Sequence, residues 1–174
     1  EAFPQREKIL GLVDSIEKSV DRCSGVTHRL LGFARRMEVR REWIDLADLL
    51  KEVVSFQGTE TRHKNITVRY DIAPDLPVIE SDRGQLQQVF LNIFNNAVAA
   101  VPSGGTIAIS ASPHGTHMIV AISDNGSGIP PENLRNIFEP FFSTKGEFGT
   151  GLGLSITRDI VEKVGGRIEV ESEV

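Results

Sequence analysis

The spacing of apolar residues changes several times along the chain between helical periodicity and strand alternation. Asp45 is a suitable N-cap, and the apolar residues that follow it at helical spacing predict a short helix. Alternating apolar residues at 66–70 predict a strand, and a longer helix is predicted from Ser81 or Asp82 to about Val101, where a Pro-Ser-Gly-Gly sequence ends it. This part of the chain therefore mixes helices and strands.

The C-terminal part continues the mixture. We predict a hairpin of strands 106–112 and 117–123, a short helix near 132–138, a last helix over about 152–164, and a strand that begins at Ile168. Elements in this order indicate an α/β fold, namely a two-layer α/β sandwich with a mixed sheet that helices cover on one face.

The N-terminal part has a different pattern, because residues 5–37 carry a heptad seam of apolar or small side chains. The seam positions are Ile9, Val13, Ile16, Val20, Cys23, Thr27, Leu30, Ala34 and Met37. Such a seam favours one long helix in a dimer or bundle interface, and a helix that lies on its own domain is the alternative. We therefore expect a helical segment over 1–44 and a globular domain over 45–174.

The composition excludes some functions. The chain has 174 residues, with 19 Lys and Arg against 24 Asp and Glu and a formal net charge of −5, so no overall positive field would attract nucleic acid. The single cysteine, Cys23, excludes an internal disulfide. Charged residues interrupt the N-terminus, and polar residues, Pro and Gly interrupt the uncharged stretch 84–123, so neither a signal peptide nor a membrane span is predicted.

Three asparagines lie within the predicted helix 82–101. Asn92 and Asn96 are four residues apart and share a helix face, and Asn95 lies close by. Amides inside an apolar helix are costly unless they find partners. The pattern indicates either a polar edge bonded to neighbouring loops or a neutral oxygen ligand for Mg²⁺, which completes its shell with water and phosphate oxygens.

Asp124 directly follows the second strand of the predicted hairpin and begins the sequence Asp-Asn-Gly-Ser-Gly-Ile-Pro. An ionised Asp only accepts hydrogen bonds, and adenine carries an amino donor. Gly126 and Gly128 would let the backbone approach such a base closely. The alternative is a plain Asp-Asn-Gly turn.

Two further segments contain candidate phosphate contacts. In the Phe-Phe-Ser-Thr-Lys sequence of 141–145, an aromatic ring can anchor the loop while Lys145 reaches a phosphate, or the loop simply packs and exposes its lysine. The sequence Gly-Thr-Gly-Leu-Gly-Leu-Ser over 149–155 opens the last helix, where backbone N–H groups favour an anion. This glycine pattern fits neither a Walker loop nor a Rossmann turn.

Together, these four segments resemble the sequence boxes of the catalytic ATP-binding domain of sensor histidine kinases, which has the Bergerat (GHKL) ATPase fold. They occur in the family's order over about 65 residues, and the resemblance extends over roughly residues 20–172. It implies ATP and Mg²⁺ as ligands, phosphoryl transfer to a histidine, a response-regulator receiver domain as partner, and a homodimer through the N-terminal helix of the full-length protein. It also implies a cytoplasmic domain and leaves open an anchor of the parent protein in the inner membrane.

The resemblance also implies roles for single residues. Asn96 would bind Mg²⁺, Asn92 and Lys145 would be the other catalytic residues, and Asp124 would recognise adenine. The implied ATP-binding residues are Asn92, Asn95, Asn96, Asp124, Gly126, Gly128, Ile129, Phe141, Thr144, Lys145, Gly149, Thr150, Gly151, Leu152, Gly153 and Leu154. Hydrolysing members such as gyrase carry a Glu base at the position of Asn92, so an Asn there favours transfer to a positioned acceptor over hydrolysis.

The chain departs from the family pattern at three places. No histidine has the acceptor motif, which is His-Glu/Asp with a Pro five residues on, and the string around His28 resembles the second helix of the dimerisation hairpin. We therefore expect that 1–44 contains this second helix without the acceptor helix, and that the chain alone does not autophosphorylate. Ala99 stands where many relatives carry Lys or Arg, and Val174 precedes the expected closing strand of the domain.

Two other functions stay open at this point. A serine kinase of the anti-sigma type shares the same boxes, although the long heptad seam argues against it. A nucleotide-dependent interaction module without catalysis would also keep the nucleotide-binding residues.

Overall fold

The computed structural model of the chain describes residues 40–145 and 149–174. The predicted helix over 5–37, with its heptad seam and His28, lies outside the described residues. The described residues belong to a unit that spans Val39–Val174, which begins before residue 45, the domain boundary expected from the sequence.

Two helices begin at the aspartate caps that the sequence predicts. α2 spans Leu46–Phe56 and α4 spans Arg83–Ala100. Asp45 and Asp82 precede them in extended conformation, and each side chain accepts a hydrogen bond from a backbone N–H of the first helical turn. Both predicted helices are therefore confirmed.

The main sheet has three strands in the order β2-β4-β5. β2 (Thr67–Ile72) pairs in parallel with β4 (Thr106–His114), and β4 pairs antiparallel with β5 (His117–Asp124). A tight turn at Gly115, whose φ is +59°, joins the two long strands and confirms the predicted hairpin. The sheet is mixed, as the predicted fold class requires.

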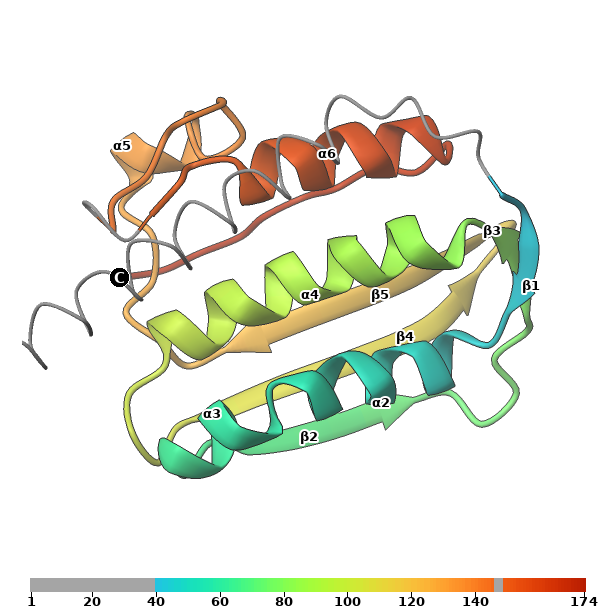
Figure 1. Ribbon diagram of the computed structural model, residues 1–174, viewed down its shortest axis with the longest axis horizontal. Coiled ribbons are helices and arrows are strands. Elements are labelled where there is room, and N and C mark those ends of the chain that lie inside the picture. Colours follow the sequence, from blue (N-terminus) through green and yellow to red (C-terminus); the bar gives the residue numbers. More distant parts are fainter. Residues whose placement is uncertain (1–39, 146–148) are drawn as a thin grey trace, which may run out of the picture. The chain divides into compact units, whose positions relative to one another are not determined.

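Helices cover one face of this sheet (Figure 1). α4 packs against β5 and lies between α2 and α6, which spans Gly153–Lys163. The short helices α3 (Gly58–His63) and α5 (Pro131–Leu134) complete the layer, and α5 is shorter than the helix predicted near 132–138. The architecture is the predicted two-layer α/β sandwich.

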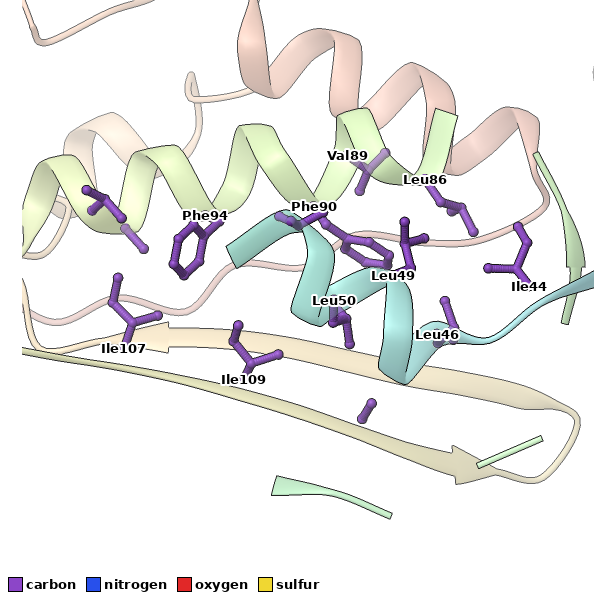
Figure 2. Packing of buried hydrophobic residues seen from close by; sticks show 14 of the residues in the cluster. Ile44, Leu46, Leu49, Leu50, Leu86, Val89, Phe90, Phe94, Ile107 and Ile109 are labelled. Atoms are coloured by element: carbon purple, nitrogen blue, oxygen red, sulfur yellow. The ribbon is translucent and has the colours of Figure 1, made fainter. Parts of the chain in front are cut away.

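The hydrophobic core lies between α2, α4 and the sheet (Figure 2). Phe94 of α4 is fully buried, together with Leu49 and Leu50 of α2 and Ile107 and Ile109 of β4. Full burial of such a side chain stabilises the fold by roughly 1.5–3 kcal/mol. This packing fixes α4 through one side and leaves Asn92 to face α6 and Asn96 to face the loop that carries Lys145.

Two features of the fold differ from the sequence prediction. A small antiparallel pair, β1 (Glu42–Ile44) with β3 (Ile79–Ser81), was not predicted. The predicted strand beginning at Ile168 is wrong, because the residues after Gly166 form no strand. The backbone N–H of Ile129 instead bonds the Ser172 side chain, and a side-chain contact of this kind does not build a strand ladder.

Candidate functional site

The three asparagines of α4 have different surroundings because the helix buries only one side. Phe94 and Ala97 face the core, whereas Asn95 is exposed and Asn92 and Asn96 are half-buried. The two amides that the sequence places on one helix face are thus at the border between the core and the polar surface.

Asn92 joins α4 to the beginning of α6. Its Nδ2 lies 3.2 Å from Gly153 O and 3.3 Å from Thr157 Oγ1, and it donates to both oxygens. Thr157 is fully buried, so this amide satisfies a polar group inside the helix–helix contact. The contact fixes the end of the glycine-rich sequence against α4.

Asn96 and Lys145 come together although they are far apart in the sequence. Lys145 Nζ donates a hydrogen bond to Asn96 Oδ1 at 3.0 Å. The side chain of Lys145 as a whole is exposed, but partial desolvation of its ammonium lowers its pKa, and the nearby positive charge of Lys64 lowers the pKa further. The amide oxygen therefore already points toward positive charge.

Asp124 closes β5 and shapes the turn that follows it. Its Oδ1 accepts a hydrogen bond from Gly126 N at 2.8 Å, and the neighbouring Asn125 Oδ1 accepts one from Thr106 N at 2.7 Å. The Asp124 side chain is exposed, and a carboxylate that accepts one such bond keeps a second oxygen for a further donor. An amino group is the kind of partner that this oxygen can take.

The structure explains why residue 128 is a glycine, which the sequence alone did not reveal. Its φ is +70°, and a side chain at this position would overlap the carbonyl oxygen of Glu173. The next residue, Ile129, donates its N–H to Ser172 Oγ at 2.8 Å. The turn at Gly128 and Ile129, part of the predicted nucleotide site, thus contacts the C-terminal segment of the chain.

The aromatic segment 141–145 and the glycine-rich sequence that begins at Gly149 contact each other. Residues 146–148, which join them, lie outside the described residues. Phe141 N donates to Gly151 O at 2.9 Å, and a side chain on Gly151 would overlap the Phe141 backbone. Both residues have positive φ, +68° and +64°, and Phe141 is 74% exposed. A side chain on Gly149 would likewise overlap the Ser143 hydroxyl.

The other predicted site residues differ in exposure. Leu152 is buried at the start of α6, Thr150 and Leu154 are half-buried, and Thr144 is exposed. Their contact with a nucleotide stays a prediction. Sequence reasoning missed Thr157, whose signal is a polar residue four positions after Gly153 on an otherwise apolar helix side.

The chain belongs to the family described as histidine kinase-, DNA gyrase B-, and HSP90-like ATPases, whose model matches residues 81–174. Sensor histidine kinase ZraS of Escherichia coli (strain K12) is 34% identical over 162 residues, which are 93% of this chain and 35% of that protein. Sporulation kinase C of Bacillus subtilis (strain 168) is 34% identical over 172 residues, 98% of this chain and 39% of that protein. The chain thus spans between a third and two fifths of the length of these relatives.

Solved structures of histidine kinases have the same fold. The nucleotide-free catalytic domain of histidine kinase ThkA matches with a TM-score of 0.65 and 36% identity, over 74% of this chain and 82% of that one. Full-length ShkA in complex with AMPPNP matches with a TM-score of 0.78 and 28% identity, over 89% of this chain and 34% of that one.

Fold and relatives together define the class of the protein. It is an ATP-binding catalytic domain of the histidine kinase family. Within the part of the chain that the structure describes, no helix combines the length and the apolar character that a membrane crossing needs.

Proposed function

We propose that this domain binds Mg-ATP and transfers the γ-phosphoryl group to a histidine on a helix outside the domain. The observation that carries the proposal is the contact between Lys145 Nζ and Asn96 Oδ1 at 3.0 Å. It joins a cation suited to phosphate and a neutral oxygen suited to Mg²⁺ in one place. The structure of ShkA with AMPPNP supports ATP as the nucleotide.

The residues at α4 fit a magnesium ion. Asn96 offers a neutral amide oxygen that is already oriented toward a positive group, and Mg²⁺ takes few protein ligands because it keeps water and phosphate oxygens. When bound, the ion would neutralise charge on the phosphates. Asn96 would hold the ion, and Lys145, which lies beside the Asn96 amide, would contact a phosphate oxygen.

Adenine recognition is assigned to Asp124 in this proposal. Hydrogen bonds of Gly126 N and of the Asn125 side chain fix this turn, and they leave the Asp124 carboxylate exposed at the end of β5. Its remaining acceptor oxygen would take the amino group of the base. Gly149, Gly151 and Gly153 would offer backbone N–H groups to the phosphates at the start of α6.

Phosphoryl transfer is preferred over hydrolysis because α4 has no base. The helix Arg83–Ala100 contains no Asp or Glu, and Asn92, at the position of the hydrolytic Glu, spends its amide on Gly153 and Thr157. Without a base to activate water, catalysis has to come from positioning of an acceptor and from stabilisation of charge.

The acceptor histidine and the downstream partner come from outside the described residues. His63, His114 and His117 are exposed at the ends of α3 and of the hairpin strands, and none has the acceptor motif. The complex of ThkA with response regulator TrrA, at 27% identity and a TM-score of 0.76, supports a receiver domain as partner; it covers 95% of this chain and 47% of that one. A homodimer through the N-terminal helix is part of the same proposal.

The proposal is tested by label transfer. The chain is mixed with γ-labelled ATP, Mg²⁺ and a separate hairpin that carries an acceptor histidine, and the label should be acid-labile and base-stable. The chain alone should stay unlabelled. Asn96→Ala should reduce transfer by at least about 100-fold if the amide positions the metal, whereas the exposed Asn136→Ala serves as the matched control. Acid-stable label on a serine, or no transfer at saturating nucleotide, would contradict a histidine kinase.

A further inference from the structure

Strand pairing brings together two histidines that the nucleotide site does not use. His114 ends β4 and His117 begins β5, and the two are direct partners in the antiparallel register. Only Gly115 and Thr116 lie between them, and Gly115 makes the tight turn with its φ of +59°. Directly opposed residues have Cβ atoms about 4.5–5.5 Å apart, so two of the chain's four histidines meet at one point.

Both histidines lie on the sheet face that is turned away from the helices. Ile109 and Ala111 of β4 are buried in the core, and side chains alternate along a strand, so His114 lies on the opposite face. Its direct partner His117 shares that face, and both residues are exposed. This hairpin tip and Asp124 lie at opposite ends of β5 (Figure 1), which has eight residues and is therefore roughly 24 Å long.

The residue that precedes His117 orients its ring. Thr116 Oγ1 lies 3.1 Å from His117 Nδ1, which is within hydrogen-bond distance. In the tautomer whose Nδ1–H donates to this hydroxyl, Nε2 keeps its lone pair for another partner. Metal-binding histidines use their second ring nitrogen for an orienting bond of this kind. The contact therefore prepares His117 to act as a ligand through Nε2.

The simpler role of the pair is to keep the end of the hairpin in water. A turn with a glycine at positive φ needs only polar neighbours, and two exposed imidazoles meet that need. This role requires no histidine at either position, however, and it gives no function to the contact between Thr116 and His117. Two opposed imidazoles, one of them oriented, are the arrangement that a chelated ion needs.

From this geometry we propose that His114 and His117 together bind one divalent transition-metal ion of the class that imidazole prefers, which is Zn²⁺, Ni²⁺ or Cu²⁺. Among the described residues, no group of three or more His, Cys, Asp or Glu side chains could hold a metal ion. Water would therefore complete the coordination shell, and the site would stay open on its outer side. The inference goes beyond the proposed function, because the tip and the nucleotide residues lie at different ends of the sheet.

Calorimetric titration of the 174-residue chain with Zn²⁺, without nucleotide, tests the site. His114→Ala and His117→Ala should each weaken binding by at least about tenfold, because a single imidazole loses the chelate effect. His63→Ala is the matched control, since His63 is also exposed but lies at the end of α3, and it should change nothing. An excess of Mg²⁺, which prefers oxygen ligands, should not displace Zn²⁺.

A transplanted pair separates the paired geometry from the short spacing of the two histidines in the sequence. Ser112 and Ile119 are also direct partners, they are exposed, and they share the face of His114 and His117. Ser112→His with Ile119→His, made in the chain that carries both His→Ala changes, should restore Zn²⁺ binding. Thr116→Val should weaken binding in the otherwise unsubstituted chain, because it removes the partner of Nδ1.

The outcomes decide the inference without reference to the nucleotide site. It is wrong if the chain binds no Zn²⁺ at millimolar concentration, if either His→Ala variant binds as tightly as the unsubstituted chain, or if the transplanted pair fails to bind. ATP titration of the same variants should give an unchanged Kd, which also shows that they fold. If ATP binding is absent from the unsubstituted chain, the proposed function falls while the Zn²⁺ result stands by itself.

Discussion

Phe94 and Phe141 are the same residue type in two regions with opposite surroundings. Phe94 lies in the framework, which we define as α2, α4 and the sheet β2-β4-β5, and its side chain is 0% exposed. Phe141 lies in the glycine-rich segment, which we define as residues 125–152 apart from 146–148, and this residue is 74% exposed. The framework is held by buried apolar side chains, as Figure 2 shows for α2, α4 and β4.

The glycine-rich segment is held differently. Three of its residues, Gly128, Phe141 and Gly151, have positive φ, and hydrogen bonds such as Phe141 N to Gly151 O determine its path. Segments with few buried apolar contacts open at lower free energy than a core. The comparison teaches that stability and the proposed nucleotide contacts are only partly separate. Asp124 and Lys145 lie at or within this segment, whereas Asn92 and Asn96 lie on α4 and thus belong to the framework.

The largest difference in the free energy of unfolding is expected between alanine variants of the two phenylalanines. Phe94→Ala should lower the free energy of unfolding by about 3–5 kcal/mol, because it leaves a cavity between α4 and the sheet. Phe141→Ala should change it by less than about 0.5 kcal/mol, because the ring is exposed. Urea denaturation of both variants checks the pair. Similar losses in the two variants would show that the segment belongs to the same cooperative core.

A smaller effect is expected at Asn92, which joins the framework to α6, the helix that directly follows the glycine-rich segment. Asn92→Ala removes donors to Gly153 O and Thr157 Oγ1 and should cost about 1–2 kcal/mol of unfolding free energy. Hydrogen exchange should also rise at the first turn of α6. The exposed neighbour Asn95→Ala is the matched control and should be almost neutral.

A double-mutant cycle sharpens this second prediction. Thr157→Val keeps the volume of the buried side chain and removes its oxygen, so its effect should not add to that of Asn92→Ala. The expected coupling is about 0.5–1.5 kcal/mol. Full additivity would mean that the amide and the hydroxyl act independently.

The framework could largely be predicted from the sequence because its signals are local. Asp45 and Asp82 sit directly before residues at helical spacing, and the alternation in 106–112 and 117–123 defines the hairpin. The pair β1–β3 could not be predicted in this way, since each strand has three residues and exists only through pairing with a distant one. The strand expected from Ile168 failed for the related reason that alternation does not supply a partner.

The candidate site shows the same limit. Asn96, Lys145 and Asp124 were found as residues through their sequence segments, but the contact between Asn96 and Lys145 depends on how the glycine-rich segment folds back. The contact of Asn92 with Thr157 depends on the packing of α4 against α6.

The smallest effect is expected where α6 meets the glycine-rich segment through a charged side chain. The Arg158 guanidinium carbon lies 5.8 Å from the centre of the Phe138 ring, and both side chains are half-buried. A cation–π contact of this exposure is worth about 0.5–1 kcal/mol, so Arg158→Gln should lower the urea midpoint slightly. Phe138→Leu keeps an apolar side chain, and in this background Arg158→Gln should no longer lower the urea midpoint. If Arg158→Gln costs the same in the Phe138→Leu background, the arginine stabilises α6 by another route, and the Phe138 ring does not hold α6 to the glycine-rich segment.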